Sequence, residues 1–313
     1  MRDRRVLAVG VPEFGGPEVL EIVEVPAQPL LPGTVRLKVQ AATVNPTDTM
    51  LRQGAYVPYY PDDPMPWIPG MEAAGVVAEV GEGVMHLDVG ALAMAIVAPH
   101  GAYREDIVLP ADSVVHAPRG VDAVAASTLP MNGLTAWATL EALALRPGQV
   151  LAVTGAAGTY GGYTIQLAKH AGLTVIADAS AADEDLVRGL GADIVVPRGD
   201  DVADRILEHL PLGVDGLADG SVQGDLVLPA VKDGGGVATV RLYVGPDDRG
   251  LRFFPIMVSQ VAREREALES LARRVEDGTI SLRVADTFPA ARASDAHRRL
   301  EAGGVRGRLV LTF

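Results

Sequence analysis

The sequence predicts an α/β protein in which a strand-rich domain is interrupted by a parallel sheet flanked by helices. Up to about Gly120, short alternating stretches are separated by Pro, Gly and Asp turns. After Pro118, apolar strands alternate with helices, and from about Val258 the strand-rich texture returns. Apolar residues make up 48% of the chain and aromatics only 4%, so aliphatic side chains must fill the interior, as in parallel sheets covered by helices.

In the first part, Val35–Val39 and Gly75–Val80 alternate apolar and polar residues, which predicts half-buried strands. The run from Val89 to Pro99 is too short to cross a bilayer and indicates a buried strand. The Pro-rich segment from Tyr56 to Pro69 has no period and is therefore predicted to be a loop. A loop of this length is often functional, although a passive connector fits the composition equally well.

The middle part predicts a series of β-α-β units. Strands separated by helices imply a parallel sheet with right-handed crossovers. The predicted strands are Val150–Thr154, Leu173–Ala177, Ile194–Val196, Gly213–Ala218 and Gly236–Val240, and the predicted helices are Tyr160–Ala171, Ala182–Leu190 and Val202–Leu210.

The last part resembles the first in texture. A strongly charged helix from Arg263 to Glu276 is followed by short strands at Leu282–Val284 and Arg308–Leu311. We therefore expect a discontinuous first domain that the C-terminus completes. At 313 residues, two domains are also the expectation from length alone.

Composition excludes several classes of function. The chain has 40 acidic and 27 basic residues, a formal net charge of −13, which disfavours nucleic acid and anionic membrane surfaces as partners. It has no cysteine, so disulfides, a thiolate nucleophile and Cys-ligated zinc are excluded. The start fits neither a signal peptide nor an anchor, and we expect a cytoplasmic protein. The six histidines are scattered, without metal-ligand spacing, and are predicted to be surface or turn residues.

The most informative motif is the glycine-rich segment from Val150 to Gly162. An apolar strand is followed by a glycine turn and a helix, which is the arrangement that brings backbone N–H groups close to a pyrophosphate. Its spacing, G-x-x-G-x-x-G, matches the usual dinucleotide fingerprint only in part, and a bare tight turn is the alternative. The predicted cofactor-binding residues of the turn are Gly155, Ala156, Ala157, Gly158, Thr159, Tyr160 and Gly161.

Two charged residues bear on the choice of cofactor. Asp178 ends the next predicted strand, where an acid commonly accepts hydrogen bonds from the adenosine ribose of NAD. Arg198 follows the strand after that and is suited to pairing with the 2′-phosphate of NADP. Each is also explained by a solvated turn charge, so the residues alone leave the preference open.

Taken together, the motifs resemble those of the zinc-independent quinone oxidoreductase branch of the medium-chain dehydrogenase/reductase superfamily, over essentially the whole chain. The segments that carry the resemblance are Val44–Asp48, Ile68–Val77, Gly101–Tyr103, Asn132–Trp137, Thr154–Gly158, Phe288–Ala291 and Ala296–Leu300.

The resemblance implies a GroES-like, β-rich substrate domain (1–121 and 257–313) and a Rossmann domain with a doubly wound parallel sheet (122–256), with the nicotinamide in the cleft. Zinc-dependent relatives carry Gly-His-Glu where this chain has Gly70-Met71-Glu72. Because Met is a poor ligand for a hard catalytic zinc, we expect no zinc. NADPH is the family's usual cofactor, and NADH stays possible because of Asp178. A homodimer is also implied.

The resemblance further assigns candidate site residues. Asn45, Asp48 and Tyr56 correspond to the family's nicotinamide-pocket Asn, Asp and Tyr, while a second family Tyr is replaced by Met50. Asn132 and Thr135 precede a predicted helix, where they either contact the cofactor or cap the helix. Arg198 aligns approximately with a family Tyr near the adenosine phosphate.

These expectations define a function. Because the cofactor carries the hydride chemistry, the pocket's task is positioning: Asn45 and Asp48 would orient the reactants, and Tyr56 would donate a proton to the developing oxyanion. We expect an NAD(P)H-dependent oxidoreductase that reduces a quinone or an activated enone. The alternatives are an enoyl-thioester reductase and a non-catalytic, crystallin-like dinucleotide-binding protein.

Overall fold

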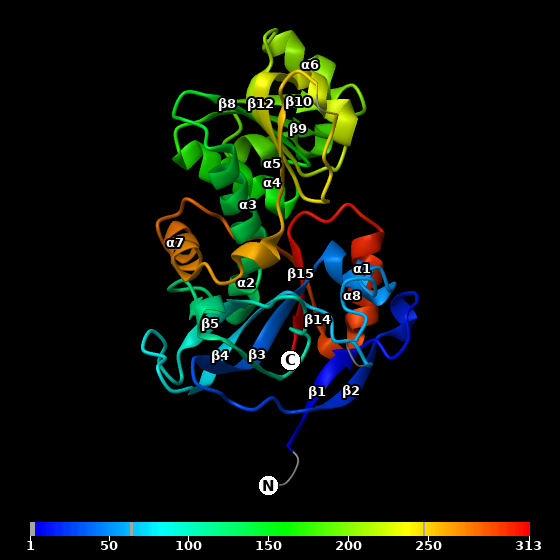
Figure 1. Ribbon diagram of the computed structural model, residues 1–313, viewed down its shortest axis with the longest axis vertical. Coiled ribbons are helices and arrows are strands. Elements are labelled where there is room, and N and C mark those ends of the chain that lie inside the picture. Colours follow the sequence, from blue (N-terminus) through cyan, green and yellow to red (C-terminus); the bar gives the residue numbers. More distant parts are fainter. Residues whose placement is uncertain (1–3, 63–64, 247) are drawn as a thin grey trace. The chain divides into compact units, whose positions relative to one another are not determined.

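A computed structural model of the chain describes residues 4–62, 65–246 and 248–313. These residues divide into two compact units (Figure 1). The first unit comprises the described residues up to Met131, together with Ala262–Glu276 and Leu282–Phe313. The second comprises Asn132–Val261 and Asp277–Ser281. The chain thus leaves the first unit and returns to it, and no helix of the described residues has the length and apolar character needed to span a membrane.

The first unit is built on a seven-stranded sheet. Six of its strands lie in the order β14-β15-β3-β4-β5-β7, and the seventh strand, β6, pairs with β3. All pairings are antiparallel except β14 with β15. A separate antiparallel pair joins β1 to β2. The strands are β1 (Arg5–Gly10), β2 (Glu21–Pro26), β3 (Thr34–Val44), β4 (Glu72–Val80), β5 (Leu92–Ile96), β6 (Asp106–Pro110), β7 (Val114–His116), β14 (Val284–Pro289) and β15 (Arg308–Thr312).

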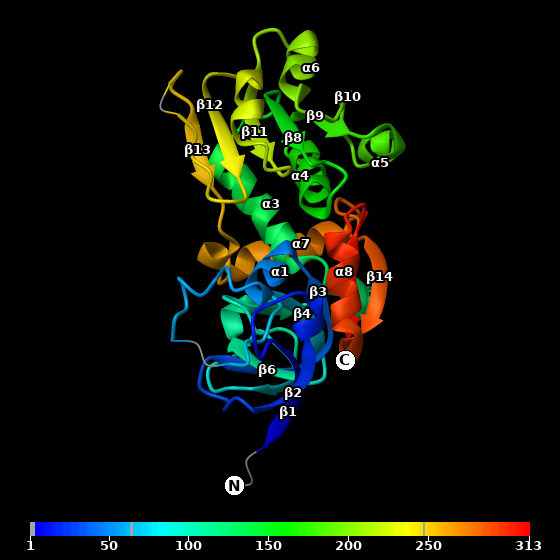
Figure 2. The same ribbon diagram turned by 90° about the vertical axis from the view of Figure 1, so that its right-hand side faces the viewer.

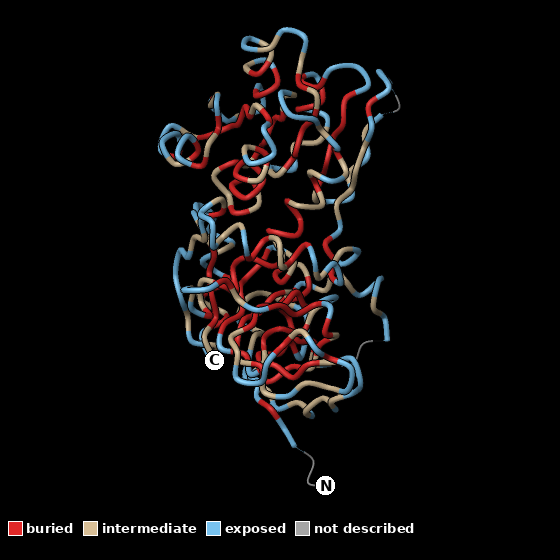
Figure 3. Tube along the Cα trace, turned by 90° about the vertical axis from the view of Figure 1, so that its left-hand side faces the viewer, coloured by how far each residue is buried: buried red, intermediate tan, exposed pale blue. Residues whose placement is uncertain are grey.

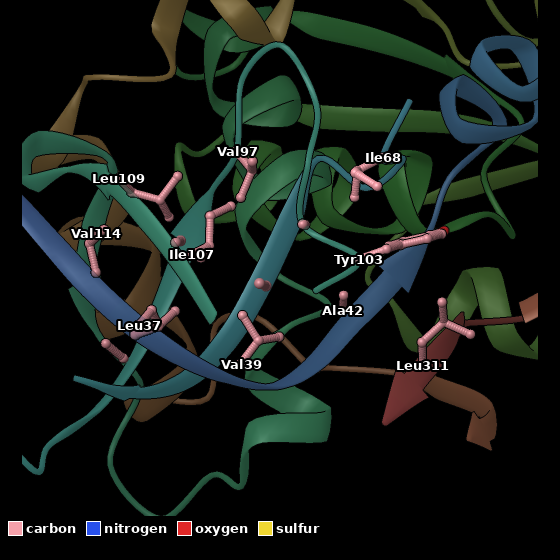
Figure 4. Close-up of a cluster of buried hydrophobic side chains, with 14 of the residues drawn as sticks. Leu37, Val39, Ala42, Ile68, Val97, Tyr103, Ile107, Leu109, Val114 and Leu311 are labelled. Carbon is pink, nitrogen blue, oxygen red and sulfur yellow. The ribbon is translucent and has the colours of Figure 1, made fainter. Parts of the chain in front are cut away.

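The aliphatic core of this unit lies on one face of the sheet. Alternating residues of the strands point to the same side, and they meet the side chains of α8 from the C-terminal segment. Figure 4 shows part of the cluster, in which the hydroxyl of Tyr103 points away from Ile107 and Leu109. The helices of this unit are α1 (Pro46–Arg52), α2 (Ala123–Ala126), α7 (Arg265–Glu276) and α8 (Ala293–Glu301).

The second unit holds a six-stranded parallel sheet with the order β10-β9-β8-β11-β12-β13 (Figure 2). Its strands are β8 (Val150–Thr154), β9 (Thr174–Ala179), β10 (Ile194–Pro197), β11 (Val214–Asp219), β12 (Val231–Thr239) and β13 (Arg252–Pro255). Its helices are α3 (Pro130–Leu143), which begins in the first unit, α4 (Thr159–His170), α5 (Glu184–Gly189) and α6 (Val202–His209). Short 3-10 helices complete the described chain at Pro17–Val19, Ala111–Ser113, Ala181–Asp183, Gly224–Ala230, Val258–Val261 and Ala290–Arg292.

Both faces of this parallel sheet are covered. Along β8, Leu151 and Val153 pack on one side with α3, α4 and α5, while Ala152 packs on the other side with α6 and the 3-10 helix at Gly224–Ala230. Successive residues of a strand point to opposite faces, so a continuous apolar run is required where both faces are buried. Figure 3 shows buried stretches within both units. The predicted α/β fold class, with a GroES-like and a Rossmann-type sheet, is confirmed.

Four local predictions were wrong. Asn132 and Thr135 do not precede a helix but lie inside α3, because Pro130 occupies its first turn, where proline is well suited. The charged helix begins at Arg265, and the strand predicted at Leu282–Val284 begins only at Val284. His297 is not a surface residue but is fully buried on α8. The segment from Tyr56 to Pro69 contains hydrogen-bonded turns and residues 63–64, which lie outside the described residues.

Candidate functional site

The glycine turn lies between β8 and α4 in the second unit. Gly155 has a φ of +65°, and a Cβ there would be 2.9 Å from the carbonyl carbon of Gly220. A Cβ on Gly161 would be 2.6 Å from the carbonyl oxygen of Gly155. Gly158 is the N-cap residue of α4. Because side chains at these positions would clash or be strained, the turn keeps its backbone exposed to close approach, and it fits the pyrophosphate of a dinucleotide.

Asp178 contacts this turn directly. The backbone N–H of Ala156 donates a hydrogen bond to Oδ1 of Asp178 over 3.1 Å. The carboxyl group is buried, and this burial raises its pKa above the ordinary value even though the turn amides and Arg198 oppose the shift. The structure therefore places Asp178 of β9 against the turn that follows β8.

Arg198 lies at the same end of the sheet. In the parallel pairing of β10 with β9, Val196 is opposite Asp178 and Pro197 is opposite Ala179, and the backbone N–H of Arg198 donates to the carbonyl oxygen of Ala179 over 2.8 Å. Arg198 is exposed, and its charge lowers the pKa of Asp178. The two residues that the sequence offered for cofactor choice are thus neighbours.

Tyr160 and Asn132 are two further predicted residues of this unit. The Tyr160 hydroxyl shares a hydrogen bond of 2.9 Å with Oγ1 of Thr139, and burial raises the pKa of Tyr160 to about 12. Its hydroxyl is therefore neutral and already engaged within the protein. Nδ2 of Asn132, by contrast, is buried and has no hydrogen-bond partner among the described residues, which is the state expected of a donor that a ligand completes.

A buried carboxylate that the sequence reasoning missed stands beside the glycine turn. Asp219, at the end of β11, accepts hydrogen bonds from Oγ1 of Thr154 over 2.8 Å and from the backbone N–H of Gly224 over 3.0 Å. Nε2 of Gln223 donates to the carbonyl oxygen of Gly199 over 2.9 Å. These bonds connect the turns that follow three parallel strands. The sequence held one signal for Asp219, because it is an acidic residue at the carboxyl end of a predicted strand, as Asp178 is.

In the first unit, Asp48 is buried and fully hydrogen-bonded. Its Oδ1 accepts from the backbone N–H of Gly70 over 2.9 Å, and its Oδ2 accepts from the backbone N–H of Asn45 over 2.8 Å and from the Tyr103 hydroxyl over 3.1 Å. Desolvation raises the pKa of Asp48 to about 6, against the effect of these three donors. As the third residue of α1, Asp48 holds the start of this helix and ties it to Gly70.

Asn45 belongs to a second buried group that the sequence reasoning missed. Its Oδ1 accepts from Nη2 of Arg308 over 2.5 Å, and its Nδ2 donates to Oε1 of Glu72 over 3.2 Å. The same Nη2 of Arg308 contacts Glu72 over 2.8 Å and Oγ1 of Thr43 over 2.9 Å. The buried carboxylate of Glu72 is thereby paired with a cation, as a buried charge requires. Nε of Arg308 and Oγ1 of Thr47 are buried without a partner among the described residues.

Tyr56 lies just beyond α1 and is half-buried. Its ring packs against the small apolar cluster of Val11, Leu51 and Trp67 and is 6.2 Å from the ring of Tyr59. The structure thus brings Asn45 and Asp48 into one buried hydrogen-bonded region, whereas Tyr56 lies in an adjoining apolar one.

The residues present do not fit a catalytic zinc ion. Zinc is held by Cys, His or carboxylate ligands, and the chain has no Cys. Met71 stands beside Glu72, which is already bound to Arg308. Among the described residues, no group of three His, Asp or Glu side chains is arranged to hold a metal ion.

Comparison with known proteins places this arrangement in context. Residues 31–119 match the profile of the alcohol dehydrogenase GroES-like domain, and residues 190–311 match that of the zinc-binding dehydrogenases. The chain is 31% identical to the chloroplastic NADPH-dependent alkenal/one oxidoreductase of Arabidopsis thaliana over 96% of this chain and 77% of the relative. It is 30% identical to the quinone oxidoreductase of Pseudomonas aeruginosa over 95% of this chain and 97% of the relative.

Solved structures agree with these relatives. The quinone oxidoreductase of Coxiella burnetii has a TM-score of 0.87 and 26% identity, covering 99% of this chain and 100% of the other. The mycobacterial protein Rv1454c in complex with NADPH has a TM-score of 0.85 and 28% identity, covering 98% and 100% of the two chains.

Proposed function

The chain belongs to the quinone oxidoreductase branch of the medium-chain dehydrogenase/reductase superfamily, and on that premise we propose that it reduces a quinone or the activated C=C bond of an enone with NADPH. The single observation that carries the proposal is the glycine turn. At Gly155 and Gly161 a side chain would collide with the backbone, so the turn is suited to a ligand that contacts main-chain amides. Membership of the branch makes the protein an oxidoreductase.

The cofactor is proposed to lie along the carboxyl ends of the parallel strands. The turn from Gly155 to Gly161 and the N-terminus of α4 hold the pyrophosphate, and the exposed guanidinium of Arg198 pairs with the 2′-phosphate of NADPH. Asp178 disfavours that phosphate by its charge and is the feature that admits NADH. When bound, the nicotinamide supplies the hydride, and the buried donor of Asn132 supplies a hydrogen bond to the cofactor.

At the acceptor end, Tyr56 is proposed to donate the proton that the reduced acceptor takes up at oxygen. Asn45 and Asp48 act through position, because their side chains are held by buried partners: Arg308 and Glu72 for Asn45, and Gly70 and Tyr103 for Asp48. These bonds fix the start of α1, which lies eight to ten positions before Tyr56, and so set the segment that carries the tyrosine.

We further propose that the reaction needs no zinc, that the protein is a homodimer and that it is cytoplasmic. Zinc independence is supported by Met71 and the lack of cysteine. Met is a poor ligand for a catalytic zinc, and a chain without cysteine offers no thiolate ligand in its place. The dimer rests on resemblance to the family, and the location rests on the lack of cysteine, because such a chain needs no oxidising compartment. Light scattering of the purified protein, with activity measured after treatment with a chelator, tests the first two.

The deciding assay follows oxidation of NADPH and NADH against a panel of quinones, small enones and enoyl thioesters. We expect turnover of quinones or enones. Turnover confined to enoyl thioesters would shift the substrate class, and saturable cofactor binding without turnover of any acceptor would contradict the proposed activity.

A further inference from the structure

A line of polar side chains in the first unit extends beyond the contacts that the proposed chemistry uses, and it is buried up to Arg52 and ends at the exposed Glu301. It begins at Asp48, whose Oδ2 is 3.1 Å from the Tyr103 hydroxyl, and the same hydroxyl is 3.4 Å from Nε2 of His297. Nδ1 of His297 is 3.3 Å from Nη1 of Arg52. Nη2 of Arg52 donates to Oε1 of Glu301 over 2.5 Å. His297 and Glu301 lie on α8, and Asp48 and Arg52 lie on α1.

The chemistry of the end groups fixes the direction of every hydrogen bond in this line. A guanidinium can only donate, so Nδ1 of His297 accepts from Arg52 and carries no proton. The proton of the neutral imidazole is therefore on Nε2, which donates to the Tyr103 oxygen. The Tyr103 hydroxyl then donates to the carboxylate of Asp48.

Burial supports this neutral form of the imidazole. His297 and Tyr103 are fully buried, and Arg52 is almost so. Desolvation and then the charge of Arg52 lower the pKa of His297 to about 3, since a second positive charge beside the guanidinium is unfavourable in a low-dielectric interior. The other charged groups at this point are the carboxylate of Asp48, two bonds away along the line, and that of Glu301, which neutralises Arg52.

The two groups that His297 joins hold opposite ends of α1. Through Tyr103 it contacts Asp48, which fixes the helix start and the backbone of Gly70. Through Arg52 it contacts the last residue of the helix, whose Nε also donates to the carbonyl oxygen of Gly15 over 3.0 Å. The segment after Arg52 continues at once into the turns that carry Tyr56.

We propose that His297 is a positioning residue of the reductase, held as the Nε2–H tautomer between Arg52 and Tyr103 so that α8 fixes α1 and the Tyr56 segment. The functional part of this inference rests on the proposed role of Tyr56. The tautomer and the contact between the helices do not, because they follow from the geometry of this line alone.

Nitrogen NMR of the uniformly ¹⁵N-labelled full-length protein tests the tautomer directly. His297→Gln identifies the His297 signals, and exposed His209→Gln is the control for the assignment. We expect the two-bond ¹⁵N–¹H pattern of a neutral Nε2–H imidazole, unchanged from pH 8 to pH 5. An Nδ1–H pattern, or protonation of His297 within that range, would overturn the inference whether or not the protein turns over any acceptor.

Two substitutions separate the two contacts. In His297→Asn the amide oxygen takes the place of Nδ1 and still accepts from Arg52, whereas in His297→Gln the terminal amide takes the place of Nε2 and leaves Arg52 without this acceptor. We expect kcat to fall about tenfold in His297→Gln and much less in His297→Asn, with the Kd of NADPH unchanged in both. Equal kcat values for the two variants, or a parallel loss of cofactor affinity, would overturn the positioning role.

Discussion

Asp178 on β9 accepts a hydrogen bond of 3.1 Å from the backbone N–H of Ala156, inside the turn proposed to bind the cofactor's phosphates. The acid expected to read the adenosine ribose is therefore also a support of the phosphate turn. A buried carboxylate at this position sets the local charge as well as the local geometry, and the two effects can be separated by substitution.

Asp178→Asn keeps an oxygen at the same place that accepts from Ala156 but removes the charge, while Asp178→Ser removes the charge and also shortens the side chain, which withdraws its oxygen from Ala156. If the charge opposes the 2′-phosphate, each variant should favour NADPH over NADH by about a further tenfold, the size of one unfavourable charge pair near a surface. Calorimetric Kd values for both cofactors check this. An unchanged Kd ratio in both variants would remove Asp178 from cofactor selection.

Gly161→Ala places a Cβ 2.6 Å from the carbonyl oxygen of Gly155, so the start of α4 must move away from the turn. We expect affinity for NADPH to fall by at least tenfold. Gly189→Ala in α5 is the matched control, because nothing lies within 4 Å of its Cβ, and it should leave the Kd unchanged and stabilise the fold by up to about 1 kcal/mol. Equal Kd values for the two variants would argue against the turn as the phosphate site.

Tyr56→Phe removes the proposed proton donor but keeps the ring that packs against Leu51 and Trp67. Turnover should fall by about 10²-fold or more, the usual contribution of general acid catalysis, with little change in cofactor Kd. Tyr59→Phe changes a more exposed neighbour and should be nearly silent. Equal losses of turnover and cofactor binding in Tyr56→Phe would reduce its role to packing.

The line of side chains from Asp48 to Glu301 also predicts how stability depends on pH. The pKa of His297 is lowered to about 3 in the fold. Its contribution to the free energy of unfolding is therefore present above the pKa of the unfolded chain, about 6.5, and is lost as pH falls toward 3. The pKa of Asp48 is raised to about 6 in the fold, so Asp48 has the opposite effect on the pH dependence of stability. Its contribution to the free energy of unfolding is present at low pH and is lost as pH rises through 6.

Comparison of wild type with His297→Gln isolates the histidine, because Asp48 is present in both. The difference in free energy of unfolding between the two proteins should shrink by about 2 kcal/mol between pH 7 and pH 5. Urea denaturation at the two pH values measures it. A difference that stays constant would mean that His297 takes up a proton equally well in the folded and unfolded states.

The parts of the fold that the sequence predicted are those set by neighbours in the chain. The continuous apolar run of Leu151, Ala152 and Val153 indicates a strand buried on both faces. The glycine turn is recognisable from the strand and the helix that flank it. Pro130 was also a signal for the start of α3, because proline is favoured in the first turn of a helix. The capping preference of Asn132 and Thr135 instead suggested that the helix starts later.

The buried polar groups could not be predicted in the same way. Arg308 binds Glu72 across 236 positions of sequence, and His297 meets Arg52 across 245. No periodicity or spacing relates such pairs, because the return of the chain to the first unit brings them together. His297 therefore looked like a surface residue on a charged helix, although its own helix face packs inward with Ala293 and Ala296.

The central claim is the transfer of hydride from the nicotinamide to the acceptor, and isotope labelling follows it directly. The protein is incubated with NADPH carrying deuterium at the transferred C4 position and a small enone, and the product is examined by NMR. We predict one deuterium on the β-carbon of the saturated ketone. Unlabelled saturated ketone, or NADPH that binds saturably while every enone and quinone tested is recovered unchanged, would contradict the account.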